Sequence, residues 1–209
     1  MKCIMVLSVV LPFVLYGTSS AGIIDPCKSK CEFYPSVSPT VLFVCPQGDT
    51  PSFSDQGWWL SLEIVDFNSN PIADIPAADF WLIDCDPALD LVLCAGSASS
   101  SADASTNNQG LTTMSAGTMR AGGCADGLSV VVQGFVLEDE SSNCDIYCYP
   151  IHVRSPDFDG NLTVDLVDLS LFAQHFPTPY DDCYDLDING HINLVDVSMF
   201  AQHYFHECQ

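Results

Sequence analysis

Residues 166–176 read LVDLSLFAQHF, and residues 194–204 read LVDVSMFAQHY, so the C-terminal part of the chain contains a repeat. The substitutions between the two copies preserve side-chain size and polarity. Each copy follows a loop rich in Asp and Asn, at 157–168 and 185–196. Because a repeated pattern usually reports one structural unit used more than once, we expect a loop–helix unit that occurs twice.

The two loops place oxygen-bearing residues at the spacing that calcium loops use. Calcium takes about six to eight oxygen ligands, from places one, three, five, seven, nine and twelve of such a loop. The second loop fills every place, has Gly190 at the sharp turn, and has Ile192 where such loops pair through a short β contact. The first loop has Leu162 at its turn, where a positive φ is costly, so we expect weaker binding or a distorted loop there. We predict two Ca²⁺ sites with the ligands Asp157, Asp159, Asn161, Thr163, Asp165 and Asp168 in the first loop, and Asp185, Asp187, Asn189, His191, Asn193 and Asp196 in the second.

The charge balance of the whole chain agrees with cation binding. The 209 residues include 27 Asp and Glu against 5 Lys and Arg, for a formal net charge of −22. Nucleic acid is excluded as a default partner, because phosphate binding needs clustered basic side chains. A hydrophobic content of 48% is too high for a disordered acidic tail, so the chain is expected to fold.

The first 21 residues have the composition of a secretory signal. Lys2 precedes an apolar stretch at 4–16, and small residues at Ser19 and Ala21 fit cleavage after Ala21. The alternative is an uncleaved membrane anchor, but the stretch is shorter than the roughly 20 residues that span a bilayer. We therefore predict a signal peptide at 1–21, a secreted or cell-surface protein, and no membrane span after cleavage.

Cysteine content points to the same compartment. Of 11 cysteines, Cys3 lies in the signal, and the even number that remains predicts a disulfide framework. Zinc is the alternative for the two C-x3-C pairs, Cys27/Cys31 and Cys144/Cys148. Cys183 and Cys208 are the only cysteines after residue 154, so we predict that they pair with each other; the alternative is that they reach the preceding region.

Residues 22–154 have a different pattern. The stretch at 58–67 partly alternates polar and apolar residues, and about seven short β-branched or aromatic runs separated by turn residues predict an antiparallel β-sandwich. The sequences LEIVD at 62–66, NPI at 70–72 and NNQGLTT at 107–113 resemble bacterial immunoglobulin-like domains of adhesins and invasins. We place a boundary near Arg154, because the remaining chain has ten carboxylates and no Lys or Arg.

The duplicated loop–helix pattern of 155–209 resembles a type I dockerin domain. The resemblance implies a small all-α module of paired half EF-hands that packs with approximate two-fold symmetry and binds a cohesin-like module on a scaffold or cell surface. It also implies partner contacts at Leu166, Val167, Leu194 and Val195, although the family usually has small hydroxyl residues there. The alternative is that these four aliphatic side chains pack the core of the module itself.

The predicted fold is thus an immunoglobulin-like, disulfide-bonded β-sandwich at 22–154 followed by an all-α dockerin-like module at 155–209. The favoured function is calcium-dependent docking by a secreted, non-catalytic protein. A small polysaccharide-acting enzyme or carbohydrate-binding module is the main alternative, because Trp58, Trp59 and Trp81 could stack on sugar rings, although they could equally be core residues. A surface-layer or filament subunit is a third possibility.

Overall fold

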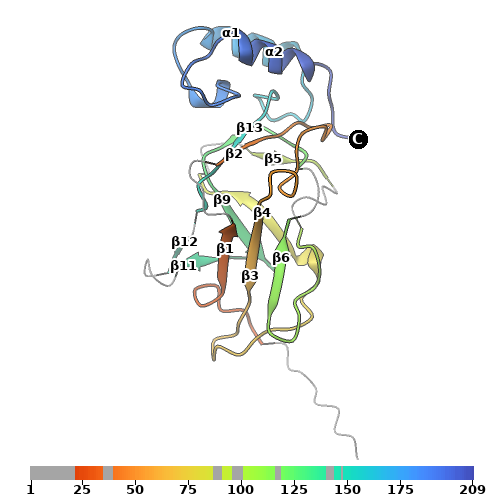
Figure 1. The fold of residues 1–209 in the computed structure, drawn as a ribbon, viewed down its shortest axis with the longest axis vertical. Coiled ribbons are helices and arrows are strands. Elements are labelled where there is room, and N and C mark those ends of the chain that lie inside the picture. Colours follow the sequence, from red (N-terminus) through yellow and green to blue (C-terminus); the bar gives the residue numbers. More distant parts are fainter. Residues whose placement is uncertain are drawn as a thin grey trace, which may run out of the picture.

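A computed structural model describes residues 22–34, 40–86, 91–95, 101–115, 119–139, 144–146 and 148–209. The signal peptide predicted at 1–21 lies outside these residues. Figure 1 shows an elongated molecule with the two α-helices at one end and most strands in the body below them. No helix in the described part of the chain has the length and apolar character needed to cross a membrane.

The strands of the described residues form five small sheets. Two three-stranded antiparallel sheets make the body, and a third sheet lies between this body and the helices (Figure 1). The first has the order β1 (Lys30–Tyr34), β3 (Trp59–Glu63), β6 (Leu111–Met114), and the second β10 (Phe135–Val136), β9 (Leu128–Val132), β4 (Phe80–Asp84). The third has the order β2 (Thr40–Phe43), β13 (Ile151–Arg154), β8 (Cys124–Ala125), with β13 parallel to β2. Two short pairs complete the set: β5 (Val92–Leu93) with β7 (Ala121–Gly122), and β11 (Glu138–Asp139) with β12 (Asp145–Ile146). A 3₁₀ turn, η1 (Ala77–Asp79), precedes β4.

Alternation along the strands positions one shared core. In β3, Leu60 and Leu62 are fully buried, while Trp59, the first residue of the strand, is 40% exposed. Strand β9 instead buries all five residues, as expected for a strand that is covered on both faces. Buried side chains of β2, β3, β4, β6, β9 and β13 belong to a single hydrophobic cluster, so the small sheets depend on one another for stability.

The predicted fold class is wrong. The strands do not form the two long facing sheets of an immunoglobulin-like sandwich, because many are only two residues long and β2 and β13 pair in parallel. The C-terminal segment is not an all-α module either: it has only α1 (Leu166–His175), α2 (Leu194–Gln202) and the 3₁₀ turn η4 (Asp182–Tyr184), joined by loops. Alternation in the sequence identified extended segments, but it carries no information on which segments pair or how long each ladder becomes.

The C-terminal segment packs around aromatic rings. Each helix buries one phenylalanine, Phe172 in α1 and Phe200 in α2, and the two ring centroids lie 6.1 Å apart. Phe158 stacks on both rings, with centroids at 5.8 Å and 6.0 Å. Among the described residues, the buried members of this second cluster are Val164, Leu186 and Phe200. Such a small core gives little apolar stabilisation, so the segment depends on other interactions.

Two disulfides attach this segment to the β-rich region, and the predicted Cys183–Cys208 pair is wrong. Cys183 is bonded to Cys124, and Cys208 is bonded to Cys94. The physical reason is the path of the tail after α2: Phe205 N–H donates to the Val164 carbonyl, and Val164 N–H donates to the His206 carbonyl, so the tail runs back along the first loop. This path takes the end of the chain to β5.

The C-x3-C pairs do not form a zinc site. Cys27 is bonded to Cys144, and Cys85 is bonded to Cys148. Among the described cysteines, Cys31 and Cys45 form no disulfide. The framework therefore uses eight of the ten cysteines that follow the predicted signal.

Candidate functional site

The first acidic loop is organised by carboxylates that accept backbone hydrogen bonds. Asp157 Oδ1 accepts from Asn161 N–H at 3.2 Å, and its Oδ2 accepts from Leu162 N–H at 2.8 Å. Asp168, at the start of α1, reaches back to accept from Phe158 N–H at 2.7 Å and from Asp165 N–H at 2.8 Å. Both carboxylates are fully buried. The loop thus closes on its own first and last acid.

The second loop repeats this pattern. Asp185 accepts from Asn189 N–H at 3.2 Å and from Gly190 N–H at 2.7 Å. Asp196 accepts from Leu186 N–H at 2.8 Å and from Asn193 N–H at 2.7 Å, and both acids are fully buried. Because two different sequences reach the same hydrogen bonds, the geometry follows from the spacing of the acids.

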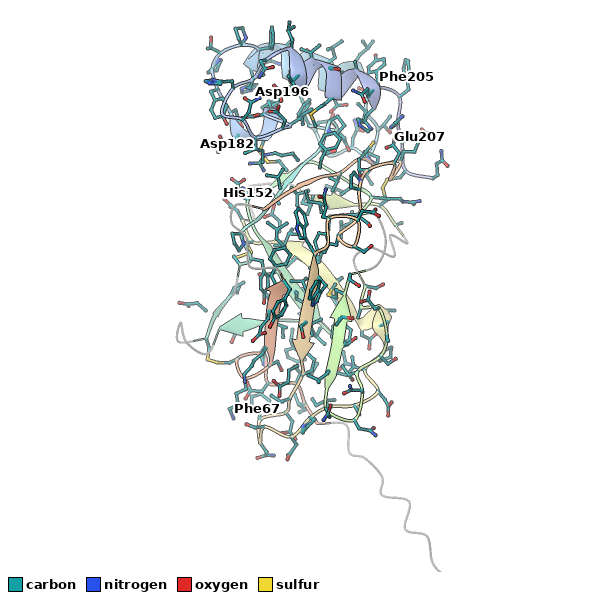
Figure 2. The ribbon with its side chains drawn as sticks, in the orientation of Figure 1. Phe67, His152, Asp182, Asp196, Phe205 and Glu207 are labelled. Atoms are coloured by element: carbon teal, nitrogen blue, oxygen red, sulfur yellow. A yellow bond between two sulfur atoms is a disulfide. The ribbon has the colours of Figure 1, made fainter. Side chains whose placement is uncertain are left out.

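In each loop the structure gathers three carboxylates. Asp157, Asp159 and Asp168 have oxygen atoms within 4.8 Å of one another. In the second loop the oxygen atoms of the equivalent trio also lie within 4.8 Å of one another: Asp185, Asp187 and Asp196. The middle acid of each trio, Asp159 in the first loop and Asp187 in the second, is exposed, so each cluster is open on one side. Figure 2 shows Asp196 at the helical end of the molecule.

Electrostatics in the first cluster disfavour the charged forms of Asp157 and Asp168. Burial raises the pKa of Asp157 to about 7; the Leu162 amide opposes this rise, and the negative charge of Asp168 adds to it. Burial also raises the pKa of Asp168. Desolvation and neighbouring negative charge both raise the pKa of these carboxyl groups, and a bound cation would offset both effects.

The donor sets fit a hard cation. All donors gathered in the two trios are carboxylate oxygens, which suit Ca²⁺. Residues 155–209 contain no Lys or Arg, and the ion pairs of the described residues do not include any of the six acids. The acids of each trio would hold the ion directly.

The remaining predicted ligands have other roles in the structure. Asp165 and Asn193 are the N-cap residues of α1 and α2, accepting from Val167 and Val195 N–H respectively. The Asn161 side chain donates a hydrogen bond to Asp159, and the Asn189 side chain donates one to Asp187. Two further predicted ligands occupy the place where a loop offers its carbonyl oxygen: Thr163 and His191.

The turn in each loop contains two residues with positive φ, which the sequence did not indicate. In the first loop these are Gly160 and Leu162, with φ of 66° and 70°. In the second they are Ile188 and Gly190, with φ of 50° and 86°. Each loop therefore has one glycine and one residue for which this conformation is costly. The expectation that only the first loop is strained is wrong, because a β-branched residue at positive φ is the more unusual case.

The expected β contact through Ile192 also differs. Val164, at the equivalent place of the first loop, forms its backbone hydrogen bonds with Phe205 and His206 of the tail. Thr163 and Glu207 form an isolated antiparallel bridge in the same contact. The C-terminal tail thus takes the place in which we expected the second loop.

Four aliphatic side chains are exposed at the starts of the helices. Leu166 and Leu194 are 68% and 75% exposed, and Val167 and Val195 are 49% and 48% exposed. The alternative that these side chains pack the core of the segment is therefore wrong. We call these two exposed Leu-Val pairs the aliphatic patch of the segment, one pair at each helix start, and the capping boxes that begin both helices hold their backbone in the same local geometry.

Sequence reasoning missed a side chain that contacts the second loop. Tyr180 donates its hydroxyl hydrogen to Asp185 Oδ2 at 2.8 Å. It comes from the linker between the repeat copies, where no spacing rule marks it. Its position shows that the linker also shapes the second trio.

The three tryptophans have different environments. Trp58 packs edge-on against Phe33 and Phe53, with centroids at 6.1 Å and 6.3 Å, and is half-buried against the core. Trp59 is exposed and stacks on exposed Tyr34, with centroids 5.5 Å apart and planes 14° apart. Trp81 in β4 is half-buried.

We compared the chain with protein-family models, with curated proteins and with solved structures, and none matches it. The interpretation of the two loops therefore depends on their own geometry.

Proposed function

We propose that this protein is secreted and that residues 155–209 bind two Ca²⁺ ions and dock onto a cohesin-like partner. The observation that carries the proposal is the burial of four carboxylates in two equivalent loops. Asp157, Asp168, Asp185 and Asp196 are fully buried without a basic partner in the described ion pairs. An isolated buried carboxylate is costly, and a cation that binds the loop offsets this cost.

The aliphatic patch supports docking as the role of the calcium-filled segment. Exposed apolar side chains that are adjacent to one another can mark an interaction site, and each helix start presents one such Leu-Val pair. Both pairs of the patch directly follow an N-cap residue that lies within an acidic loop. Calcium would thus order the helix starts that present the patch, which would make docking calcium-dependent.

The docking proposal is tested with a recombinant type I cohesin module as the probe. We expect binding in Ca²⁺ and loss of binding in EGTA. Replacing Leu166 and Val167 with Asp should leave most binding intact, because Leu194 and Val195 still offer exposed aliphatic side chains to the partner. Replacing Leu194 and Val195 as well should abolish binding, since carboxylates buried in an apolar contact lack partners.

The matched control is Ile146→Asp, which adds one charge at an exposed apolar residue of β12. The variants should keep their circular dichroism spectra in calcium, because the four side chains are exposed. If the folded quadruple variant binds as well as the parent protein, the aliphatic patch is not the docking surface.

A second function has one observation in its favour. Trp59, which stacks on Tyr34, lines an open depression of about 340 Å³ together with Trp58, Thr113 and Ser115 among others. Exposed aromatic faces beside hydroxyl groups suit the stacking of sugar rings. The β-rich region would then bind a polysaccharide while the C-terminal segment docks.

Titration with soluble plant polysaccharides tests this second function. We expect Trp59→Ala to abolish binding and Trp81→Ala, at a half-buried position away from the stacked pair, to leave it unchanged. Equal affinity of the Trp59→Ala protein and the parent would exclude the stacked rings as a binding platform.

A further inference from the structure

In addition to the two acidic trios, a cluster of metal-ligating side chains lies where the C-terminal tail meets the loop that follows β2. It consists of Cys45 and Asp49 from that loop and His203 and His206 from the tail. One ligand atom from each of these side chains lies within 4.8 Å of all the others. The cluster shares no residue with the calcium loops, and no motif in the sequence joins its two halves.

The distances within the cluster match the edges of a metal tetrahedron. Cys45 Sγ and His203 Nδ1 lie 3.3 Å from the same atom, His206 Nδ1. Asp49 Oδ1 lies 3.3 Å from His203 Nδ1 and 3.5 Å from His206 Nδ1. With metal–nitrogen and metal–oxygen bonds of about 2.0–2.2 Å and a metal–sulfur bond of about 2.3 Å, tetrahedral ligand atoms are separated by roughly 3.3–3.6 Å.

We propose that Cys45, Asp49, His203 and His206 form a zinc site that fastens the C-terminal tail to the β-rich region. One thiolate, two imidazole nitrogens and one carboxylate are ligands that zinc accepts in tetrahedral geometry. Calcium is a poor occupant, because it prefers oxygen ligands alone. On binding, the metal takes the place of the Cys45 thiol proton, which is released to solvent.

The surroundings hold these four side chains in place without a metal. A turn closed by the Gly48 N–H and the Cys45 carbonyl, at 3.0 Å, brings Cys45 and Asp49 together. On the other side, a hydrogen bond from His206 N–H to the His203 carbonyl, also at 3.0 Å, sets the two histidines on one turn. The Cys94–Cys208 disulfide anchors the tail two residues beyond His206. A metal would find a site that is already assembled, which favours tight binding.

Burial separates the cluster from an accidental surface grouping. Cys45 is fully buried, and the His203 and His206 side chains are only 13% and 18% exposed. The Phe43 ring covers His203, with centroids 5.1 Å apart. Asp49 is 40% exposed and forms the open side through which an ion can enter. Three largely buried ligands with one accessible ligand are typical of a metal site.

Cobalt titration of the intact, oxidised full chain tests the site. The protein is first saturated with Ca²⁺, so that the acidic loops do not compete for the added metal. We expect one equivalent of Co²⁺ to produce ligand-field bands of tetrahedral intensity and a thiolate-to-cobalt charge-transfer band, and Zn²⁺ to displace it. Elemental analysis of protein purified without chelators should find one zinc per chain.

Variants assign the ligands. Cys45→Ser should remove the charge-transfer band, and Cys31→Ser, at the other cysteine without a disulfide, should retain it. Asp49→Asn and His206→Gln should each weaken Co²⁺ binding by at least about tenfold, since even loss of an outer-shell partner commonly has such an effect. His152→Ala, at a histidine of β13 that belongs neither to this cluster nor to the acidic loops, should bind as the parent does.

The outcomes separate a metal site from a hydrogen-bonded cluster. If the parent protein takes up Co²⁺ without a charge-transfer band, or if Asp49→Asn and His206→Gln bind as tightly as the parent, the four side chains are held by hydrogen bonds alone and the proposal is wrong. Should Cys45→Ser fail to fold, the parent spectrum and the exposed Asp49→Asn substitution still decide.

Discussion

Removing one buried carboxylate should separate its structural role from its role in calcium binding. Asp196→Asn is the informative change, because the amide has nearly the same shape but only one acceptor oxygen. Asp196 accepts from Leu186 N–H at 2.8 Å and from Asn193 N–H at 2.7 Å. In the variant one of these donors faces the amide NH₂ group, which is itself a donor.

The expected free energies differ with and without calcium. A buried donor left without an acceptor costs about 1–3 kcal/mol, and in EGTA the loss of a buried charge offsets part of this cost. At a Ca²⁺ concentration of about 100 times the dissociation constant, one site stabilises the folded state by about 2.7 kcal/mol. The variant should therefore lose at most about 3 kcal/mol in EGTA and about 2.7 kcal/mol more than that in calcium, for a total of about 3–6 kcal/mol.

Urea unfolding followed by far-UV circular dichroism measures both quantities. Asp168→Asn is the matched variant of the first loop and should show the same difference between the two conditions. Asp74→Asn, an exposed acid in the β-rich region, should change neither value. If Asp196→Asn loses the same free energy in calcium and in EGTA, the second loop does not bind calcium through this carboxylate and the reasoning is refuted.

Three other changes test local features by the same unfolding measurement. Leu162→Gly and Ile188→Gly should each gain about 0.5–1 kcal/mol in calcium, because relief of about 1–2 kcal/mol from positive φ exceeds the backbone entropy that glycine loses; losses at both positions would show that the turns are unstrained. Burial raises the pKa of Asp126, but hydrogen bonds from His152 and from buried Arg154 lower it by a larger amount, so the net pKa lies below its usual value. The contribution of Asp126 to the free energy of unfolding is therefore present above the unfolded-state pKa and is lost as the pH falls through the folded-state pKa. Asp126→Asn should cost about 1 kcal/mol at neutral pH, because the Asp126 side chain is 45% exposed and solvent screens its ion pairs, and it should remove this acid dependence; an unchanged pH profile would contradict the assignment. Gly122→Ala should destabilise by about 1–3 kcal/mol or more, since the added Cβ would lie 1.7 Å from a carboxylate oxygen of the first loop; a neutral result would mean that β7 and the loop separate easily.

The acidic loops illustrate what local sequence determines. Their first and last acids occupy places one and twelve of each loop, and the capping boxes that start the helices involve residues three positions apart. Interactions over such short separations depend on few intervening torsions, so spacing alone predicted both helices and which acids each loop gathers, although not that the first and last acids are buried. The strain at Ile188 escaped this reasoning, because the sequence offers a glycine in each loop and does not show that each turn needs two residues with positive φ.

Long-range pairing was decided only by the tertiary structure. Cys183 and Cys208 are close in sequence to each other, yet they bond to Cys124 and Cys94, because the tail returns along the first loop and carries its cysteine to the β-rich region. The same return path brings His203 and His206 to Cys45 and Asp49. Alternating residues in β3 correctly indicated an extended, half-buried segment, but strand partners and sheet number depend on which segments share the core. The sequence by itself determined the two acidic loops and the helices that follow them, while the sheets, the disulfides and the Cys/Asp/His cluster required the folded chain, because packing and not spacing brings their distant residues together.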